Sequence, residues 1–221
     1  MSFDYNMILR YYPELLGGAW VAVWITALSL ACASMIGAVV CIGKLQKHGA
    51  ANRLATAYID LFRSIPEIVL IIWVFYCLPL LFDIGIGRYS SAIIALSAYG
   101  GAYMAEIFRA GVQAVPRGQV EAANALGIPV FHIARRVVVP PAIRRMMPAL
   151  VNFLTELLKA TSLLALIGVS ELTYVASTLG SKTFAYMEFY TAIAVLYFMI
   201  IFPLSVYARR AERRRLRRTG N

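Results

Sequence analysis

The chain has 221 residues, of which 61% are hydrophobic and only 14% are charged, and its mean hydropathy is +0.71. This composition excludes a soluble domain, which would need far more polar surface, and predicts an all-α membrane protein that crosses the bilayer several times. The net charge of +10, which in a soluble protein would favour nucleic acid, here predicts contact with membrane lipid and no nucleic acid, because the basic residues cluster beside apolar segments.

Five apolar segments are predicted to span the membrane, since about 20 apolar residues are needed to cross roughly 30 Å of hydrocarbon. Their approximate ranges are 17–43, 65–82, 90–110, 146–169 and 189–207, of which 65–82 is short. Between the first two, residues 50–63 predict an amphipathic helix along the membrane surface. Its apolar face is expected to carry Leu54, Tyr58, Leu61 and Phe62.

Basic residues predict the orientation of the chain. They gather at 44–63, 109–145 and 209–218. The positive-inside rule places all three clusters on the cytoplasmic side, which puts the N-terminus outside and the C-terminus in the cytoplasm. We expect residues 1–221 to form a single transmembrane domain, because no soluble domain fits in what remains.

The third predicted span holds two ionisable residues near its end, Glu106 and Arg109. They are three residues apart and share one helix face. A structural or gating ion pair is the preferred interpretation, ahead of substrate contact.

A polar insert at about 118–141 is the most specific feature of the sequence. Good helix formers run up to Leu126, and Gly127 is suited to a left-handed helix cap. Pro129 suits the first turn of a second short helix, which Pro140 and Pro141 are expected to stop. The insert is therefore predicted to form a compact knob on the cytoplasmic face.

The knob carries the residues expected to dock on another protein. Small side chains at Ala122 and Ala123 allow it to enter a groove, and Glu121 offers a carboxylate to a partner's arginine. The full set of docking candidates is Gly118, Glu121, Ala122, Ala123, Gly127 and Pro140. The alternative is an ordinary loop between helices that happens to contain Glu-Ala-Ala.

The fourth predicted span carries polar residues near the middle of the membrane. The candidates for a substrate pathway are Asn152, Glu156, Lys159, Thr161 and Ser162. Ionisable groups in hydrocarbon normally face a cavity or a partner. Glu156 and Lys159 can pair with each other or hold the charges of an amino acid, and Thr161 and Ser162 can line the pathway or bond to their own helix backbone.

No catalytic residue, metal site or bound cofactor is predicted. The three cysteines, Cys32, Cys41 and Cys77, fall in or beside apolar segments without the spacing of metal ligands, and no spacing is typical of a catalytic triad. The chain also lacks a GxxxxGKS or GxxxxGKT phosphate loop, so ATP would have to be hydrolysed by another polypeptide.

These motifs together resemble the permease of ABC uptake transporters for polar amino acids, the family of histidine, glutamine, arginine and opine permeases. The insert has the family's Glu-Ala-Ala signature, with Gly127 and Pro140 at the family's spacing. Further similar stretches are 62–66 (FRSIP), 102–112 (AYMAEIFRAGV) and 159–168 (KATSLLALIG), and the resemblance covers roughly residues 12–207. Ser64 and Ile65 stand where the family usually has Gly-Thr.

The resemblance implies the type I ABC importer permease fold and a bacterial cytoplasmic (inner) membrane location. It implies a translocation-pathway subunit that is not itself an enzyme. An identical or homologous permease would pair with it, two ABC ATPase subunits would dock on the insert and use ATP and Mg, and an extracytoplasmic substrate-binding protein would deliver the substrate. Whether the two permeases are identical stays open.

Polar amino acids or related compounds are the substrates that the resemblance implies, and Glu156 favours a cationic amino acid or an opine. The alternative function is an ion-gradient-driven secondary transporter or channel. That alternative would need ionisable relays in several spans, whereas only the fourth is rich in such groups.

Overall fold

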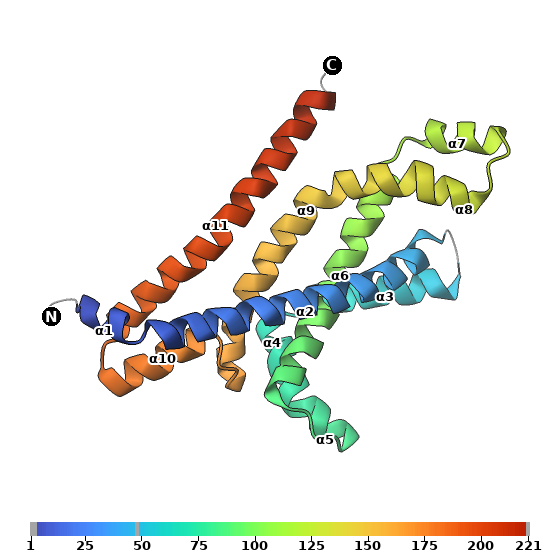
Figure 1. Ribbon diagram of the computed structural model, residues 1–221. Coiled ribbons are helices and arrows are strands. Elements are labelled where there is room, and N and C mark those ends of the chain that lie inside the picture. Colours follow the sequence, from blue (N-terminus) through green and yellow to red (C-terminus); the bar gives the residue numbers. More distant parts are fainter. Residues whose placement is uncertain (1–3, 47–48, 220–221) are drawn as a thin grey trace.

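The structure is a computed structural model that describes residues 4–46 and 49–219 and contains only helical elements there (Figure 1). The elements are α1 (Tyr5–Arg10), α2 (Tyr12–Leu45), α3 (Ala50–Ser64), α4 (Glu67–Ile72), the π-helix η1 (Trp73–Cys77), α5 (Leu78–Phe82), α6 (Arg88–Gln113), α7 (Arg117–Ala125), α8 (Val130–His132), the π-helix η2 (Ile133–Val138), α9 (Val139–Ala160), the 3-10 helix η3 (Thr161–Ile167), α10 (Leu172–Thr183) and α11 (Tyr186–Thr219). Lys47 and most side chains of the 209–218 basic cluster lie outside the described residues.

Within the described residues, four helical stretches are long and apolar enough to cross a membrane. They are Tyr12–Leu45, Arg88–Gln113, Val130–Ile167 and Tyr186–Tyr207. These stretches contain or closely match the first, third, fourth and fifth spans expected from the sequence.

The second expected span is one arm of a broken helix. The stretch from α4 to α5 has 16 residues, from Glu67 to Phe82, and so reaches only about 24 Å. It is long and apolar enough to cross only together with α3, from which it is bent by 102°. Pro66 causes the break, because it lacks a backbone N–H and holds Ile65 in an extended conformation.

The apolar face expected for α3 is only partly correct. Leu54 and Leu61 are 71% and 55% exposed, whereas Ala55 and Ile59 are the buried residues of this helix. Tyr58 also faces the protein and donates a hydrogen bond to the carbonyl of Ala98 on α6, at 2.6 Å. The helix therefore packs against α2 and α6.

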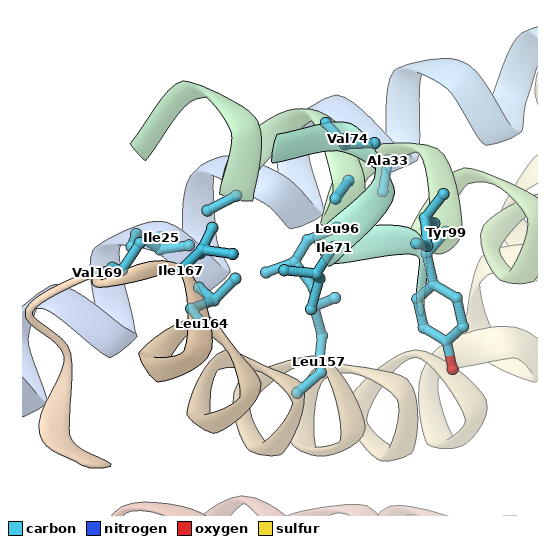
Figure 2. Packing of buried hydrophobic residues seen from close by; sticks show 14 of the residues in the cluster. Ile25, Ala33, Ile71, Val74, Leu96, Tyr99, Leu157, Leu164, Ile167 and Val169 are labelled. Carbon is cyan, nitrogen blue, oxygen red and sulfur yellow. The ribbon is translucent and has the colours of Figure 1, made fainter. Parts of the chain in front are cut away.

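The main core lies where α2, α4, α6, α9 and η3 meet. Figure 2 shows Ile71 of α4, Leu96 of α6 and Leu157 of α9 pointing toward one another. Ile25 of α2 and Leu164 of η3 extend the same cluster, and all five residues are at most 1% exposed.

Small residues bring α2 and α6 into close contact. A Cβ atom added at Gly100 of α6 would lie 2.8 Å from the Cβ of Ala33, and one added at Gly37 of α2 would lie 2.5 Å from the Cβ of Met104. Such small-residue contacts let the backbones of membrane helices approach closely, where dispersion forces replace the missing hydrophobic drive.

The prediction that Pro140 and Pro141 stop the second helix of the insert is wrong. The helix continues from Val130 through η2 and α9 to Ile167. Immediately before the prolines it is a π-helix, in which the N–H of Val139 bonds to the carbonyl of Ala134, five residues earlier. This shifted bonding pattern lets the helix pass two residues that cannot donate a backbone hydrogen bond.

The two ends of the molecule carry different features. The helices α7 and α8 protrude from the bundle at the upper right of Figure 1, and α10 lies at the lower left against α2. Gly18 of α2 permits this second contact, because a Cβ there would lie 3.0 Å from the Cα of Leu172.

Candidate functional site

The protruding knob is built around a glycine corner. After α7, Gly127 has a φ of +70°, and its N–H bonds to the carbonyl of Asn124 at 2.9 Å. The N–H of Ile128 bonds to the carbonyl of Ala123 at 3.2 Å. These two bonds form a Schellman motif, which ends α7 and turns the chain into α8. The glycine corner expected from the sequence is therefore present.

The knob has a polar side and an apolar tip. Glu121 and Ala122 are exposed on α7, as are Gly118 before them and Pro140 at the start of α9. Ala123 is only 5% exposed, so it packs inside the knob, and of the two candidate alanines only Ala122 presents its side chain at the surface.

Three large apolar side chains at the tip were not singled out from the sequence. Leu126, Val130 and Phe131 are 78%, 78% and 68% exposed. Their positions on either side of Gly127 are the only signal in the sequence, because exposure of an apolar residue cannot be read from its type alone. A compact apolar tip with a polar flank is typical of a surface that docks into a groove on a partner.

One face of α9 carries the polar residues of the predicted pathway. Asn152, Glu156 and Lys159 are all exposed and lie three or four residues apart, so they form one stripe along the helix. The Nζ atom of Lys159 lies 3.0 Å from Oε1 of Glu156. Both side chains are more than half exposed in the single chain, so this ion pair contributes little to stability by itself.

The hydroxyl candidates behave differently from the charged ones. Thr161 is fully buried and donates to the carbonyl of Leu158 at 2.7 Å. Ser162, which is partly exposed, donates to the carbonyl of Lys159 at 2.7 Å. Both hydroxyls thus satisfy their own helix backbone, and Thr161 does not reach the exposed stripe.

Glu106 and Arg109 form a bidentate ion pair on α6. The Nη2 atom of Arg109 lies 2.6 Å from Oε2 of Glu106, and its Nε lies 3.0 Å from Oε1. Nη1 also donates to Oε1 of Gln113 at 2.6 Å. Glu106 lines a cavity of about 470 Å³ between α6 and α9, so the pair borders a hollow in the bundle.

A second hollow lies at the break between α3 and α4. Its volume is about 390 Å³, and its wall includes Arg63, Glu67, Tyr99, Tyr103 and Leu163. Sequence analysis did not single out this group. Tyr99 and Tyr103 come from α6, and only the folded chain brings them beside Arg63 and Glu67.

Glu171 is a fully buried carboxylate that sequence analysis also missed. It caps α10 by accepting hydrogen bonds from the N–H groups of Thr173 and Tyr174, at 2.9 and 2.8 Å. The hydroxyl of Tyr197 on α11 donates to the same carboxylate at 2.9 Å. Glu171 therefore joins α10 to α11. Its position immediately before a helical stretch was the signal in the sequence that could have identified it as a helix cap.

We expect Glu171→Gln to change how stability depends on pH. Burial raises the pKa of the Glu171 carboxyl above its ordinary value, although its backbone hydrogen bonds act in the opposite direction. The folded protein thus holds this proton more tightly than the unfolded chain does. The contribution of Glu171 to the free energy of unfolding of the wild type is fully present below about pH 4.3. It falls as the pH rises toward the folded-state pKa. The variant lacks this decline because glutamine does not titrate.

Thermal unfolding of both proteins in detergent between pH 4 and pH 8 measures the effect. The thermal unfolding midpoint of Glu171→Gln should rise relative to that of the wild type as the pH increases. Glu14→Gln, which changes an exposed residue in the first turn of α2, is the control and should follow the wild-type profile. Parallel profiles for wild type and Glu171→Gln would contradict the prediction.

Comparison with known proteins gives a consistent result. Residues 29–217 match the family model described as "Binding-protein-dependent transport system inner membrane component". The chain is 35% identical over 215 residues to the glutamine transport system permease protein GlnP of Escherichia coli strain K12, covering 97% of this chain and 98% of that protein. It is 28% identical over 214 residues to the arginine transport system permease protein ArtQ of Bacillus subtilis, with 97% and 98% covered.

Solved structures agree with the sequence relatives. A crystal structure of an amino acid ABC transporter with histidines superimposes with a TM-score of 0.88 at 31% identity, covering 97% of this chain and 100% of that one. The inward-facing MetNI methionine ABC transporter gives a TM-score of 0.72 at 22% identity, over 91% of this chain and 98% of that one, and so shares the fold.

Proposed function

The chain belongs to the family of binding-protein-dependent transport system inner membrane components, and from this premise we propose how it takes part in solute uptake. It is a permease subunit of an amino-acid ABC importer in the inner membrane, and a transport subunit and not an enzyme. The ATPase is a separate subunit in such systems, and a substrate-binding protein is a further partner. This family membership sets aside the alternative of an ion-gradient-driven transporter or channel.

The observation that carries the proposal is the exposed polar stripe of α9. Glu156 and Lys159 lie within a stretch that crosses the membrane, yet both are more than half exposed in the single chain. Charged groups facing hydrocarbon are costly, so this face must border an aqueous pathway or a partner. We propose that a second permease, identical or homologous, pairs over this face, and that Asn152 and Ser162 line the pathway beside the two charges.

The knob is proposed to receive the mechanical input. Two ATPase subunits, which bind ATP and Mg, dock on the knobs of the two permeases through Glu121, Ala122, the corner at Gly127 and the apolar tip.

In the proposed orientation, the N-terminus is outside and the C-terminus is in the cytoplasm, and residues 1–221 form one transmembrane domain. Glu106 and Arg109 act as a structural or gating pair, and no cofactor binds this chain.

Polar amino acids are the proposed substrates. The supporting relatives are named as glutamine, arginine and amino-acid permeases. Because Glu156 is paired with Lys159, the α9 face carries no net charge from this pair, and the expected preference for a cationic amino acid or an opine has no further support in the structure.

Proteoliposomes test the proposal. The permease, its ATPase and its binding protein are reconstituted together and offered labelled glutamine, arginine, octopine and glutamate. We expect ATP-dependent accumulation of at least one polar amino acid, and none when the ATPase is left out. Accumulation by the permease alone would overturn the proposed function, and a preference for glutamate would overturn the cationic expectation.

A further inference from the structure

The hollow at the break between α3 and α4 is built from groups of opposite charge. Arg63 is in the last turn of α3 and Glu67 in the first turn of α4, and both line this cavity of about 390 Å³. Its size falls within the range of small-molecule sites. We call this cavity, with Arg63, Glu67, Tyr99 and Tyr103 in its wall, the hinge chamber. The larger cavity between α6 and α9 shares Arg63 and Tyr103 with it.

The two charges of the hinge chamber contact aromatic side chains, and Arg63 is also attracted by Glu106, which borders the neighbouring cavity. The Glu67 carboxylate accepts a hydrogen bond from the Tyr99 hydroxyl, and the guanidinium of Arg63 lies 5.1 Å from the centre of the Tyr103 ring. Within residues 4–46 and 49–219, neither side chain forms an ion pair, in contrast to the Glu106–Arg109 and Glu156–Lys159 pairs.

This arrangement leaves both charges accessible to another molecule, since Arg63 is exposed and Glu67 is partly exposed. Ionisable groups inside membrane-spanning segments are normally paired with each other or face a substrate pathway. Here one cation and one anion border a single cavity, and neither forms an ion pair with the described residues. A zwitterion carries the two complementary charges.

We propose that the hinge chamber holds the α-carboxylate and the α-ammonium group of the transported amino acid. Arg63 binds the carboxylate, because its planar guanidinium donates two parallel hydrogen bonds to such a group. Glu67, oriented by Tyr99, binds the ammonium, and the neighbouring tyrosine rings add cation–π attraction. This inference rests on the proposed function and deepens it.

The location in the fold supports the same assignment. The chamber lies where the chain bends by 102° between α3 and α4, and secondary transporters place substrate sites at discontinuities in their helices. Because its two charges address only groups common to all free amino acids, the chamber sets the chemical class of the solute and leaves the choice of side chain to other contacts. A competing role is structural, since a cation at the end of α3 and an anion at the start of α4 also complement helix ends.

Direct binding distinguishes these roles. The purified permease–ATPase complex in lipid nanodiscs is titrated with tritiated L-glutamine and L-arginine in the absence of nucleotide, and with the N-acetyl and methyl ester derivatives as competitors. The N-acetyl group removes the ammonium charge, and the ester removes the carboxylate charge. We expect wild type to bind the free amino acid that it carries at least 10-fold more tightly than either derivative.

The variants have separate expected signatures. Arg63→Gln should weaken binding of the free amino acid roughly 10- to 100-fold and leave binding of the methyl ester nearly unchanged. Glu67→Gln should weaken binding of the free amino acid by a similar factor and leave binding of the N-acetyl derivative nearly unchanged. Controls on α3 are Arg53→Gln and Asp60→Asn, which change exposed charges outside the chamber and should bind like wild type. Thermal midpoints verify that every variant is folded.

Each outcome decides a different question. If Arg63→Gln and Glu67→Gln retain wild-type discrimination, the charges are structural and the chamber proposal is overturned. A complex that imports amino acids but binds none up to roughly 10 mM overturns it as well. If the wild-type complex neither binds nor imports any amino acid in the presence of ATP and the binding protein, the proposed function itself fails.

Discussion

Glu121→Lys is expected to lower ATP-driven uptake by the reconstituted importer roughly 10- to 100-fold while leaving the membrane helices folded. Glu121 is exposed on α7, and within the described residues its side chain forms no hydrogen bond or ion pair. Reversing its charge therefore removes no contact within the chain. It places a cation against the partner's arginine that Glu121 is expected to meet, where like charges repel.

Uptake and substrate-stimulated ATP hydrolysis in the same proteoliposomes measure this effect. Gln119→Lys is the control, because it introduces the same cationic side chain two residues earlier on α7, on a different side of the helix. Gly127→Pro reaches the same result by another route, since proline can neither adopt a φ of +70° nor donate to the carbonyl of Asn124. Normal coupling in Glu121→Lys and Gly127→Pro would contradict the docking assignment.

Gly37→Val is expected to destabilise the packing of α2 against α6. Its Cβ would lie 2.5 Å from the Cβ of Met104 and 2.9 Å from the backbone N of Ala105, both on α6. Backbone atoms cannot move aside as a flexible side chain does, so the two helices must separate. Overpacking of this kind costs about 1–3 kcal/mol and occasionally more.

The thermal midpoint in detergent and the uptake rate both report this loss. Gly17→Val is the control in the same helix, because a Cβ at Gly17 has no atom within 4 Å. Both variants replace a helical glycine by valine, so the propensity change is common to them and their difference isolates packing. Equal midpoints for the two variants would show that α2 and α6 do not pack as described.

Local chemistry made part of this fold predictable. Long apolar runs identified four crossing helices, and the corner at Gly127 followed from the need for a left-handed residue after α7. The expected stop at Pro140 is wrong because the usual effect of proline assumes an α-helix before it, and here a π-helix precedes it. No local sequence pattern predicts this change from α-helix to π-helix, because it depends on how the whole helix packs in the fold.

Tertiary contacts explain what the sequence did not reveal about the site. Arg63 was seen only as part of a motif, and its place beside a cavity depends on Tyr103 of α6, forty residues later. Thr161 was grouped with exposed pathway residues because its neighbours are polar, but the turn of η3 directs it into the core. Spacing along one helix identifies a shared face, and only the packed bundle decides which face is buried.

The absence of a break between the knob and the solute face has a mechanical consequence. From Val130 to Ile167 the chain is one helical stretch of 38 residues, about 57 Å along its axis, and it carries Phe131 near one end and Lys159 toward the other. No loop lies between these points, although the helix contains Pro148 and is bent along its length (Figure 1). Any push or pull on the tip therefore reaches the charged stripe through one continuous but bent helix, in which Pro148 removes a backbone hydrogen bond between the two points.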